Sequence, residues 1–277
     1  MVEATIRPTG LYSLRLTARV ETWSAQLPGG RWASARQRPD GAIVVRASCE
    51  HAVEETRFLL ALDDDTSEFH RRFSNDPVLG PSTRALRGMR PTRTATVAHA
   101  VLKAVCGQLI QSRRAREIEW EVIHACRESP PTREALGGLS AAKLCSCGLA
   151  ESRAATLARL VRTVDLESLR TARAGTALVR LRRERGIGPW SVGVIALHGL
   201  GRFDAGLVAD LSLVKLYASL RGRWPERPDE TAELLAPYGE WQGLASLFLL
   251  AGFSRGLVPG ASRDRARLVR AQRRWAA

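Results

Sequence analysis

The first quarter of the chain contains short strand-like segments, one of which alternates apolar and polar residues, whereas the remainder repeats apolar residues at helical spacing. Apolar side chains at every second position over residues 12–20 predict a β-strand. Three further segments have the composition of strands: residues 32–37, 42–47 and 56–62. These segments predict a small antiparallel sheet with one buried face.

Turn signals separate the predicted strands. Pro28-Gly29-Gly30 marks one turn, and Asp40-Gly41 marks a second that is typical of a β-hairpin. Asp65 and Glu68 then indicate the start of a short helix that runs to about Ser74.

Beyond Pro91 the pattern is helical. Thr94 is a candidate N-cap for a helix with apolar residues on one face, namely Val97, Val101, Leu102, Val105 and Leu109. Pro130-Pro131 interrupts the next helix, and Ser140 caps a short one that ends at Gly148. Apolar spacing predicts further helices around residues 157–164, 174–184, 189–199, 210–220, 229–236 and 240–251.

This order of elements predicts an α+β fold that is predominantly α-helical. We expect an N-terminal domain of antiparallel sheet and helix over residues 1–92 and an all-α core over residues 93–260. Residues 261–277 hold six arginines and are expected to form a basic C-terminal helix or tail. Such a run of charge is typical of a solvated face.

The charge of the chain favours a polyanionic partner. The formal net charge is +14 and the isoelectric point is about 10.9, so nucleic acid is the partner class to expect. Only three of the 42 basic residues are lysines. A GC-rich coding sequence explains arginine in place of lysine, but it does not explain the excess of positive charge.

The cysteine pattern indicates neither a disulfide framework nor a metal site. Five cysteines are an odd number, and no signal peptide precedes them. Cys145-Ser146-Cys147 resembles half of a metal site, but no second pair of ligands follows at a suitable spacing. No apolar run approaches 18 residues. We therefore expect a soluble, cytoplasmic protein with no membrane contact.

The most informative stretch lies between residues 186 and 210. Gly186-Ile187-Gly188 runs directly into a helix that starts at Pro189. Backbone N–H groups at such a helix start suit a phosphate group. Asp210 follows twenty positions after Trp190, where an acid could face the sugar of the bound nucleotide.

These residues resemble the helix–hairpin–helix superfamily of DNA glycosylases, and the branch for alkylated bases, 3-methyladenine DNA glycosylase II, most of all. The resemblance extends over roughly residues 10–255. Its motifs are Asp76–Leu79, Gly88–Pro91, Leu102–Ile110, Arg185–Ser191, Ala196-Leu197 and Val208–Lys215. No cysteine follows Cys147, which excludes the C-terminal iron–sulfur cluster of other branches.

The resemblance assigns the chemistry to few residues. It implies that Asp210 is the catalytic carboxylate, which stabilises positive charge on the deoxyribose, although an Asp there is also an ordinary helix N-cap. Trp190 stands where strand-cutting relatives have a lysine, so no Schiff base is expected. Trp190 is expected to line the base pocket together with Tyr12. Core packing is the alternative for both residues, and for Tyr12, on the buried face of its segment, it is the favoured one.

The resemblance also implies a DNA interface. Phosphate contacts are expected from Arg185, from the hairpin residues Gly186, Ile187 and Gly188, and from Lys215. Gln108 and Leu109 belong to the segment that probes the duplex, where Leu109 is expected to fill the space of the extruded base. A monovalent cation at the hairpin is implied as well, with no other cofactor. We expect a monomer that binds double-stranded DNA with alkylated bases.

The expected function is monofunctional removal of alkylated purines, 3-methyladenine and 7-methylguanine, by base flipping in base excision repair. Val194 and Leu211 replace tyrosines of that branch, and Val208 replaces a proline, so a less aromatic pocket is expected. Two alternatives stay open: a glycosylase for another lesion such as hypoxanthine or uracil, and a non-catalytic helix–hairpin–helix DNA-binding protein.

Overall fold

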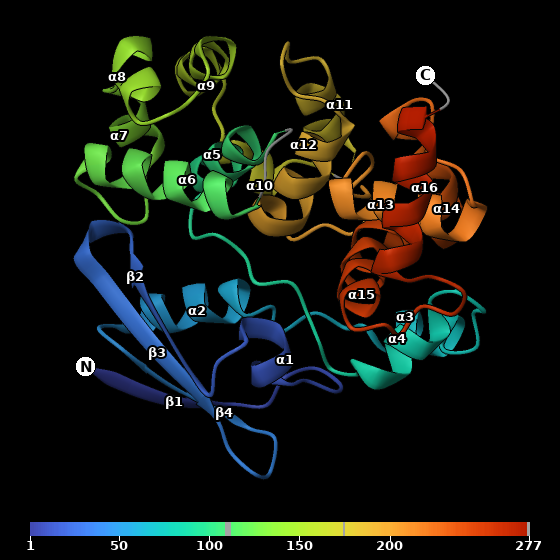
Figure 1. The fold of residues 1–277 in the computed structure, drawn as a ribbon. Helices are drawn as coiled ribbons and strands as arrows, with labels where there is room; N and C mark the ends of the chain where they lie inside the picture. The colour runs from blue at the N-terminus through green and yellow to red at the C-terminus, as the bar shows by residue number, and fades with distance from the viewer. Residues whose placement is uncertain (109–111, 174, 276–277) are drawn as a thin grey trace.

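The computed structural model describes residues 1–108, 112–173 and 175–275. A four-stranded antiparallel sheet lies at the N-terminal end of the molecule, with strand order β1-β4-β3-β2 (Figure 1). The strands are β1 (Val2–Ile6), β2 (Thr22–Leu27), β3 (Arg31–Gln37) and β4 (Ile43–Ala47). The expected small antiparallel sheet is therefore present.

Two of the predicted strands and both turns are confirmed. β3 and β4 occupy the segments predicted at residues 32–37 and 42–47, and Asp40-Gly41 joins them as a hairpin. Gly41 has a φ of 85°, which its position in this tight turn requires. Pro28–Gly30 forms the short helix η1 between β2 and β3.

The strand predicted over residues 12–20 is wrong, because this segment forms helix α1 (Leu14–Ala18). The Ser13 hydroxyl caps the helix by accepting from the Leu16 amide at 3.2 Å. Leu14 and Thr17, three residues apart, are both buried on one side of the helix. The alternation was therefore accidental, and the edge strand β2 follows this helix.

The strand predicted over residues 56–62 is also wrong. Residues Glu50–Leu59 form helix α2, which packs against the sheet (Figure 1). Its buried residues are Ala52, Val53, Thr56 and Leu59, the spacing of one helix face. β1 and β2 supply the other two strands, and the sequence pattern predicted neither of these segments.

Helices α3 (Ser67–Phe73) and α4 (Gly80–Ala85) lead from the sheet into the helical body, and α3 matches the helix predicted from Asp65. Phe69 and Phe73 of α3 are buried in the helical core rather than under the sheet. The division at residue 92 stays a prediction, but the packing of these side chains places α3 and α4 with the helices.

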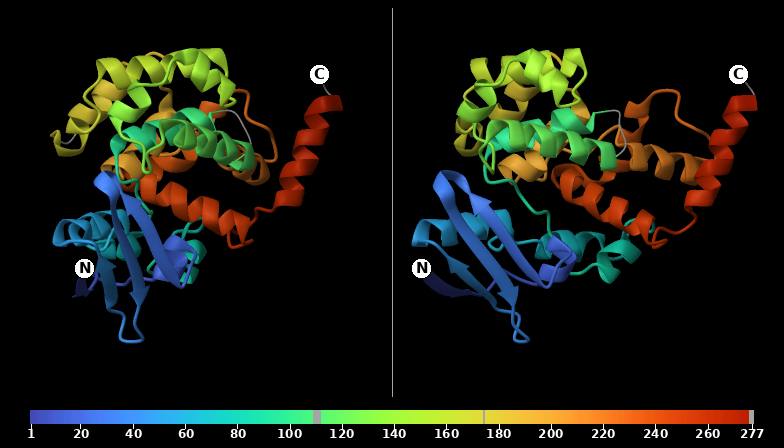
Figure 2. Two further views of the ribbon diagram at one scale, coloured as in Figure 1. Left: turned by 90° about the vertical axis from the view of Figure 1, so that its left-hand side faces the viewer. Right: turned by 60° about the vertical axis from the view of Figure 1, so that its left-hand side comes forward.

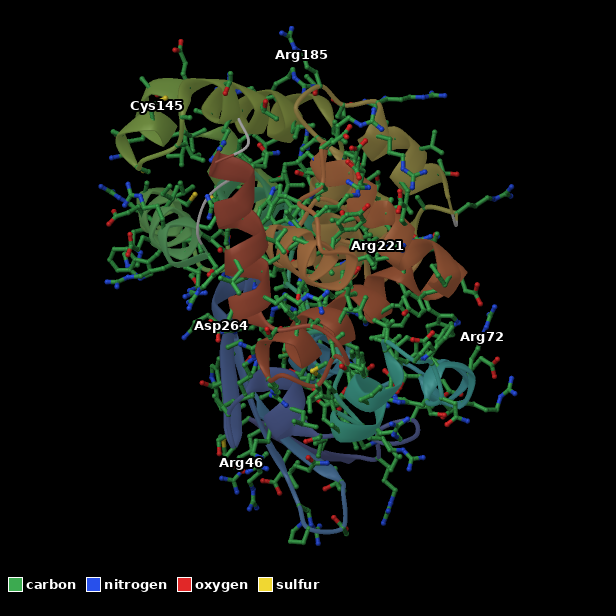
Figure 3. All side chains as sticks on the ribbon, turned by 45° about the vertical axis from the view of Figure 1, so that its right-hand side comes forward. Arg46, Arg72, Cys145, Arg185, Arg221 and Asp264 are labelled. Carbon is green, nitrogen blue, oxygen red and sulfur yellow. The ribbon has the colours of Figure 1, made fainter. Side chains whose placement is uncertain are left out.

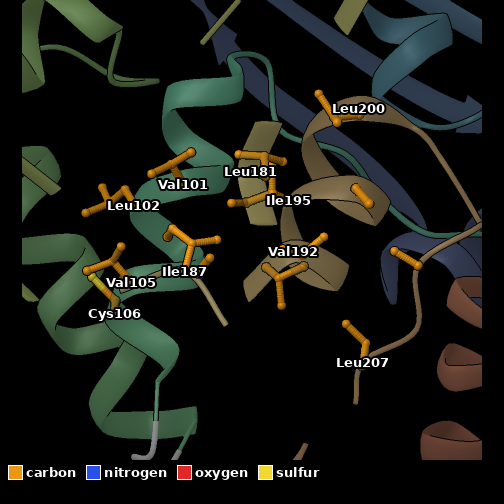
Figure 4. Close-up of a cluster of buried hydrophobic side chains, with 14 of the residues drawn as sticks. Val101, Leu102, Val105, Cys106, Leu181, Ile187, Val192, Ile195, Leu200 and Leu207 are labelled. Carbon is orange, nitrogen blue, oxygen red and sulfur yellow. The ribbon is translucent and has the colours of Figure 1, made fainter. Parts of the chain in front are cut away.

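The helical body surrounds α5 (Val97–Gly107), which packs against α6, α9, α12 and η2 (Figures 1 and 4). Thr96 rather than Thr94 caps α5, because the Thr96 hydroxyl accepts from the His99 amide at 3.0 Å. Thr94 instead donates to the carbonyl of Thr96. Val97, Val101, Leu102 and Val105 are fully buried, as predicted.

The rest of the chain is helical, as expected. The first group is α6 (Ser112–Cys126), α7 (Arg133–Gly137), α8 (Ala141–Ser146), α9 (Glu151–Thr163), α10 (Ser168–Thr171) and α11 (Thr176–Arg182). The second group is α12 (Pro189–Val194), η2 (Ile195–Leu200), α13 (Leu211–Arg221), η3 (Pro228–Thr231), α14 (Ala232–Leu235), η4 (Ala236–Trp241), α15 (Gln242–Ser254) and α16 (Arg263–Trp275). The predicted α+β class, with helices predominating, is confirmed.

Two arginines fasten the sheet to the helical body. The guanidinium groups of Arg93 and Arg170 lie 4.6 Å and 4.3 Å from the ring centroid of Phe58 in α2. Arg93 also pairs with Asp64, and Arg170 donates to three main-chain carbonyls of the helical body. Within the described ranges, none of the helices is both long and apolar enough to span a membrane.

Candidate active site

The hairpin of residues 185–188 joins α11 to α12, as the sequence predicted. Gly186 has a φ of 85°, and a Cβ atom there would lie 2.5 Å from Oγ1 of Thr156 in α9. Glycine at this position is therefore needed for the turn and for close packing on α9. Ile187 is buried in the core between α5 and α12, where it anchors the hairpin (Figure 4).

Gly188 has a different role from Gly186. A Cβ atom at Gly188 would meet nothing within 4 Å, and its φ is −84°, so no neighbouring protein atom requires a glycine there. The residue is exposed. A glycine that the fold does not need leaves the hairpin backbone open to close approach by a ligand.

Several amides of the hairpin and the helix start have no protein partner. Within the described part of the chain, no backbone carbonyl or side chain accepts from the N–H groups of Gly186, Gly188, Trp190 and Ser191. Pro189 starts a continuous helix that includes α12 and η2 and ends at Leu200. The positive end of this helix dipole adds to the attraction for an anion at the same place.

Gln108 bonds to the hairpin from the end of α5. Its side-chain Nε2 donates to the carbonyl of Gly186 and to the Ser191 hydroxyl, both at 2.9 Å. The sequence predicted that Gln108 contacts DNA. In the structure its amide supports the hairpin, and contact with DNA stays a prediction. Leu109, the residue expected to replace the extruded base, lies outside the described residues.

Trp190, the second residue of α12, lies across the end of α5. A Cβ atom at Gly107 would fall well inside van der Waals contact with the Trp190 ring. A glycine is therefore required where the ring crosses the helix. The ring is half-buried, and its indole Nε1 donates to Oδ2 of Asp210 at 3.1 Å.

Asp210 caps α13 and faces Trp190 with the same carboxylate. Oδ1 accepts from the Ser212 amide at 2.8 Å, so the N-cap interpretation of this residue is correct. Oδ2 accepts from Trp190. The side chain is half-buried rather than turned into the core. Capping and catalysis are compatible, because each carboxylate oxygen keeps a free lone pair.

The loop before Asp210 is fixed by close backbone packing. A Cβ atom at Gly193 of α12 would overlap the carbonyl oxygen of Gly206, so glycine lets the loop lie directly on the helix. The Leu207 amide donates to the Ser246 hydroxyl at 3.0 Å, and the Ala209 amide donates to Thr231 at 2.7 Å. These contacts fix the loop that places Asp210 within hydrogen-bond distance of Trp190.

Ala209 is strained immediately before Asp210. Its φ of 68° lies in the left-handed region, which costs a residue other than glycine of order 1 kcal/mol. Strain next to a polar side chain at an open helix end is typical of a functional site.

The other acidic residue of the loop before α13, Asp204, is already neutralised. Asp204 binds Arg202 through two hydrogen bonds, at 3.1 Å and 2.6 Å. By contrast, no arginine, lysine or histidine of the described residues pairs with Asp210. Asp210 therefore supplies the uncompensated carboxylate beside the hairpin.

Arg185 and Lys215 lie near the site without joining it. The Arg185 side chain is exposed and points outward at the top of the molecule (Figure 3). Lys215 is half-buried on α13, one to two turns beyond Asp210, and has no ion-pair partner among the described residues. Both positions are compatible with the predicted phosphate contacts.

Tyr12 packs elsewhere. Its ring lies 5.1 Å from the guanidinium carbon of the buried Arg90, within the core under the sheet, and burial raises the pKa of its phenol. In the described parts of the chain no hydrogen bond or ring contact joins Tyr12 to Trp190 or Asp210. Val194 is buried, whereas Leu211 beside Asp210 is 49% exposed.

The hairpin carbonyls that a monovalent cation could contact are partly engaged already. Arg159 donates to the carbonyl of Arg185 and to the carboxylate of Glu184, each at 2.5 Å. The carbonyls of Gly186 and Gly188 also accept hydrogen bonds already. Arg159 is itself paired with Glu184, and the cation that the family resemblance implied stays open to test. In the described ranges, no group of three His, Cys, Asp or Glu residues could hold a metal ion.

Sequence reasoning missed the supporting residues. Gly107, Ser191, Gly193 and Gly206 shape the site through contacts between distant segments. The one available signal was the pair Gly107-Gln108 at the end of an apolar helix face, where a glycine and an amide break the pattern.

Comparison with known proteins agrees with the predicted resemblance to DNA glycosylases. No family model matches the chain. Over 205 residues it is 26% identical to the DNA-3-methyladenine glycosylase of Bacillus subtilis, covering 68% of this chain and 67% of that protein.

Two solved structures share the fold. The 3-methyladenine DNA glycosylase of Archaeoglobus fulgidus superimposes with a TM-score of 0.76 at 18% identity, over 92% of this chain and 99% of that one. The 8-oxoguanine glycosylase/lyase of Clostridium acetobutylicum, bound to double-stranded DNA, gives 0.69 at 16% identity, over 89% and 93%. The resemblance that the motifs predict is thus confirmed, and the chain has the fold of the helix–hairpin–helix DNA glycosylases.

Proposed function

We propose that this protein is a monofunctional DNA glycosylase that removes alkylated purines, such as 3-methyladenine and 7-methylguanine, from duplex DNA. The observation that carries the proposal is the Asp210 carboxylate, oriented by the Trp190 indole beside a hairpin with unpaired amides. The names of the Bacillus subtilis relative and the Archaeoglobus fulgidus structure support the same substrate class.

The hairpin would bind the backbone of the damaged strand. Its unpaired N–H groups and the dipole of the following helix suit a phosphate, without preference for base sequence. Arg185 of the hairpin and Lys215 of α13 would add positive charge for the backbone. The target nucleotide is rotated out of the stack, which costs least for damaged and weakly paired bases.

Asp210 would act on the sugar of the rotated nucleotide. Cleavage of the N-glycosidic bond leaves its electron pair on the purine and positive charge on the deoxyribose, which a nearby carboxylate stabilises. An alkylated purine already carries a positive charge and leaves as a neutral base, so little acid catalysis is needed. Water then adds its oxygen to C1′ and releases a proton, and an abasic site results.

The proposed enzyme hydrolyses the bond without cutting the strand. A lyase reaction needs an amine that forms a Schiff base with C1′. Trp190 supplies no amine, and its N–H is engaged with Asp210. Of the three lysines in the chain, Lys215 is the one on the helix that Asp210 caps. Its proposed role is to contact the DNA backbone and not to form a Schiff base.

An excision assay with a panel of lesions tests the proposal. Duplexes with 3-methyladenine, 7-methylguanine, hypoxanthine, uracil or 8-oxoguanine are incubated with the wild type and with Asp210→Asn, and the released base is measured. Release of methylated purines by the wild type alone supports the proposal. Release of another base alone would assign a different lesion, and release of none, with duplex binding retained, would favour a non-catalytic binder.

Two finer proposals follow from a DNA substrate. The protein would act as a monomer, since one chain contributes the hairpin, the carboxylate and the base-stacking tryptophan. It would work where the chromosome is, which for a bacterial protein is the cytoplasm.

A further inference from the structure

The C-terminal helix α16 carries a stripe of arginines that the proposed function leaves unused. Arg263, Arg267 and Arg270 are separated by four and three residues, so they lie along one side of the helix. All three side chains are exposed. In the sequence Arg274 continues the same spacing.

The side of α16 next to this stripe fixes the helix to the body. Ala266 and Val269 are buried, and α16 packs against α13. The fully buried Ser219 of α13 exchanges hydrogen bonds with Ser262, at 2.9 Å and 3.1 Å. The stripe is therefore presented by a docked helix and not by a free tail.

The positive charge of α16 is almost uncompensated. Residues 261–277 contain six arginines and one acidic residue. Arg267 pairs with Asp264 across one turn, in a pair whose side chains are 80% and 85% exposed, and such surface pairs bind weakly. Arg263 and Arg270 pair with no carboxylate of the described residues, and Arg270 lies over the ring of Trp224.

The position of α16 relates the stripe to the candidate active site. α13 begins directly after Asp210 and carries α16 near its other end. Figure 3 shows α16 upright on one face of the molecule, and both views of Figure 2 place it away from the N-terminal sheet. The eleven residues of α13 correspond to about 16 Å at 1.5 Å per residue.

From this arrangement we propose that α16 is a second DNA-backbone-binding element, which holds phosphates away from the lesion. At 3.4 Å per nucleotide along a strand, 16 Å corresponds to about five nucleotides. The assignment rests on the proposed function for its partner, double-stranded DNA. Charge complementarity selects this partner, because exposed arginines without carboxylates match a polyphosphate.

The test compares two triple variants that lose the same charge. The first is Arg263→Gln, Arg267→Gln and Arg270→Gln. The control is Arg7→Gln, Arg15→Gln and Arg36→Gln, three exposed arginines of the sheet end that form no ion pair among the described residues. Glutamine resembles arginine in helix propensity, and thermal unfolding verifies that both variants fold.

Binding to an undamaged duplex is measured by fluorescence anisotropy over a range of salt concentrations. Each lost phosphate contact lowers the slope of log K against log salt by about 0.9. We expect the slope of the α16 variant to fall by about two to three, with at least tenfold weaker binding at about 0.1 M salt. The control should change by less than one. Equal slopes for the two variants would overturn the proposal.

Two readouts separate DNA binding by α16 from membrane binding and from the excision chemistry. Binding to phosphatidylglycerol vesicles is measured for both variants. Loss of vesicle binding alone, with an unchanged DNA slope, would assign α16 to an acidic membrane and overturn the proposal. Base release from the lesion panel is scored independently. A changed slope without any base release would leave α16 supported and the glycosylase assignment refuted.

Discussion

The indole N–H of Trp190 donates a hydrogen bond to Oδ2 of Asp210 across 3.1 Å, although twenty positions separate the two residues in the chain. The sequence assigned Trp190 to the wall of a base pocket and Asp210 to the chemistry. The structure joins them, so Trp190 also sets the direction of the carboxylate. A second hydrogen bond to the Asp210 carboxylate, from the Ser212 amide, fixes its other oxygen.

Asp210→Asn should separate chemistry from folding. Asparagine caps helices about as well as aspartate, so α13 should persist and duplex affinity should stay nearly unchanged. Excision of methylated purines should fall by about 10² or more, as expected when a key electrostatic group is lost. Single-turnover base release measures the rate, and full activity would place the chemistry on another residue.

Trp190→Phe should slow excision by about tenfold, because it removes one hydrogen bond to a charged group while keeping an aromatic ring. Trp190→Ala should cost more, since it also removes the stacking surface. Single-turnover rates on methylated DNA decide the point. If Trp190→Phe is as fast as the wild type, the indole N–H has no part in positioning the carboxylate.

Gly107→Ala should disturb the site through Trp190. The added methyl group would overlap the indole ring. The ring must therefore shift, and Asp210 loses the hydrogen bond from the Trp190 indole. We expect slower excision and a lower melting temperature. Gly137→Ala in α7 is the matched control, because its Cβ meets nothing within 4 Å and alanine favours a helix. Equal effects of the two substitutions would contradict this account.

The stability of the protein should fall between pH 6.5 and pH 4 through His198. Burial lowers the pKa of His198 from 6.5 to about 4, and the nearby charge of Lys103 adds to this effect. The folded state therefore favours the neutral ring. The neutral His198 ring contributes fully to the free energy of unfolding above pH 6.5. This contribution is lost as the pH falls towards 4, by up to about 3 kcal/mol at 1.36 kcal/mol per pKa unit.

Urea unfolding as a function of pH tests this expectation. His198→Asn keeps a neutral donor for the carbonyl of Thr92, which the His198 ring contacts at 2.7 Å. This variant should show a weaker loss of stability on acidification than the wild type. His51→Asn, at an exposed position, serves as the control and should follow the wild-type curve. If His198→Asn loses stability with pH as the wild type does, His198 is not the source of the acid sensitivity.

The hairpin should bind DNA without a specific monovalent cation. Arg159 already donates to the carbonyl of Arg185. Replacing potassium by tetramethylammonium at constant ionic strength should change duplex affinity by less than about twofold, because only the screening matters. A tenfold loss of affinity in tetramethylammonium would indicate a bound cation and contradict this expectation.

The sequence by itself determined the elements whose signals are local. The apolar face of α5, the capping of short helices and the glycine turn before α12 depend on neighbours within about four residues. The same local signals identified Asp210 as a residue that starts a helix. They also distinguished a sheet end from a helical body.

Only the tertiary structure decided the remainder. Residues 14–18 alternate like a strand but fold as a helix, because burial of Leu14 and Thr17 on one side outweighs the local pattern. Gln108 meets the hairpin, and Trp190 meets Gly107 and Asp210, through packing between segments far apart in the chain. Periodicity reports what each residue prefers, whereas these contacts depend on how the helices pack, which no single segment encodes.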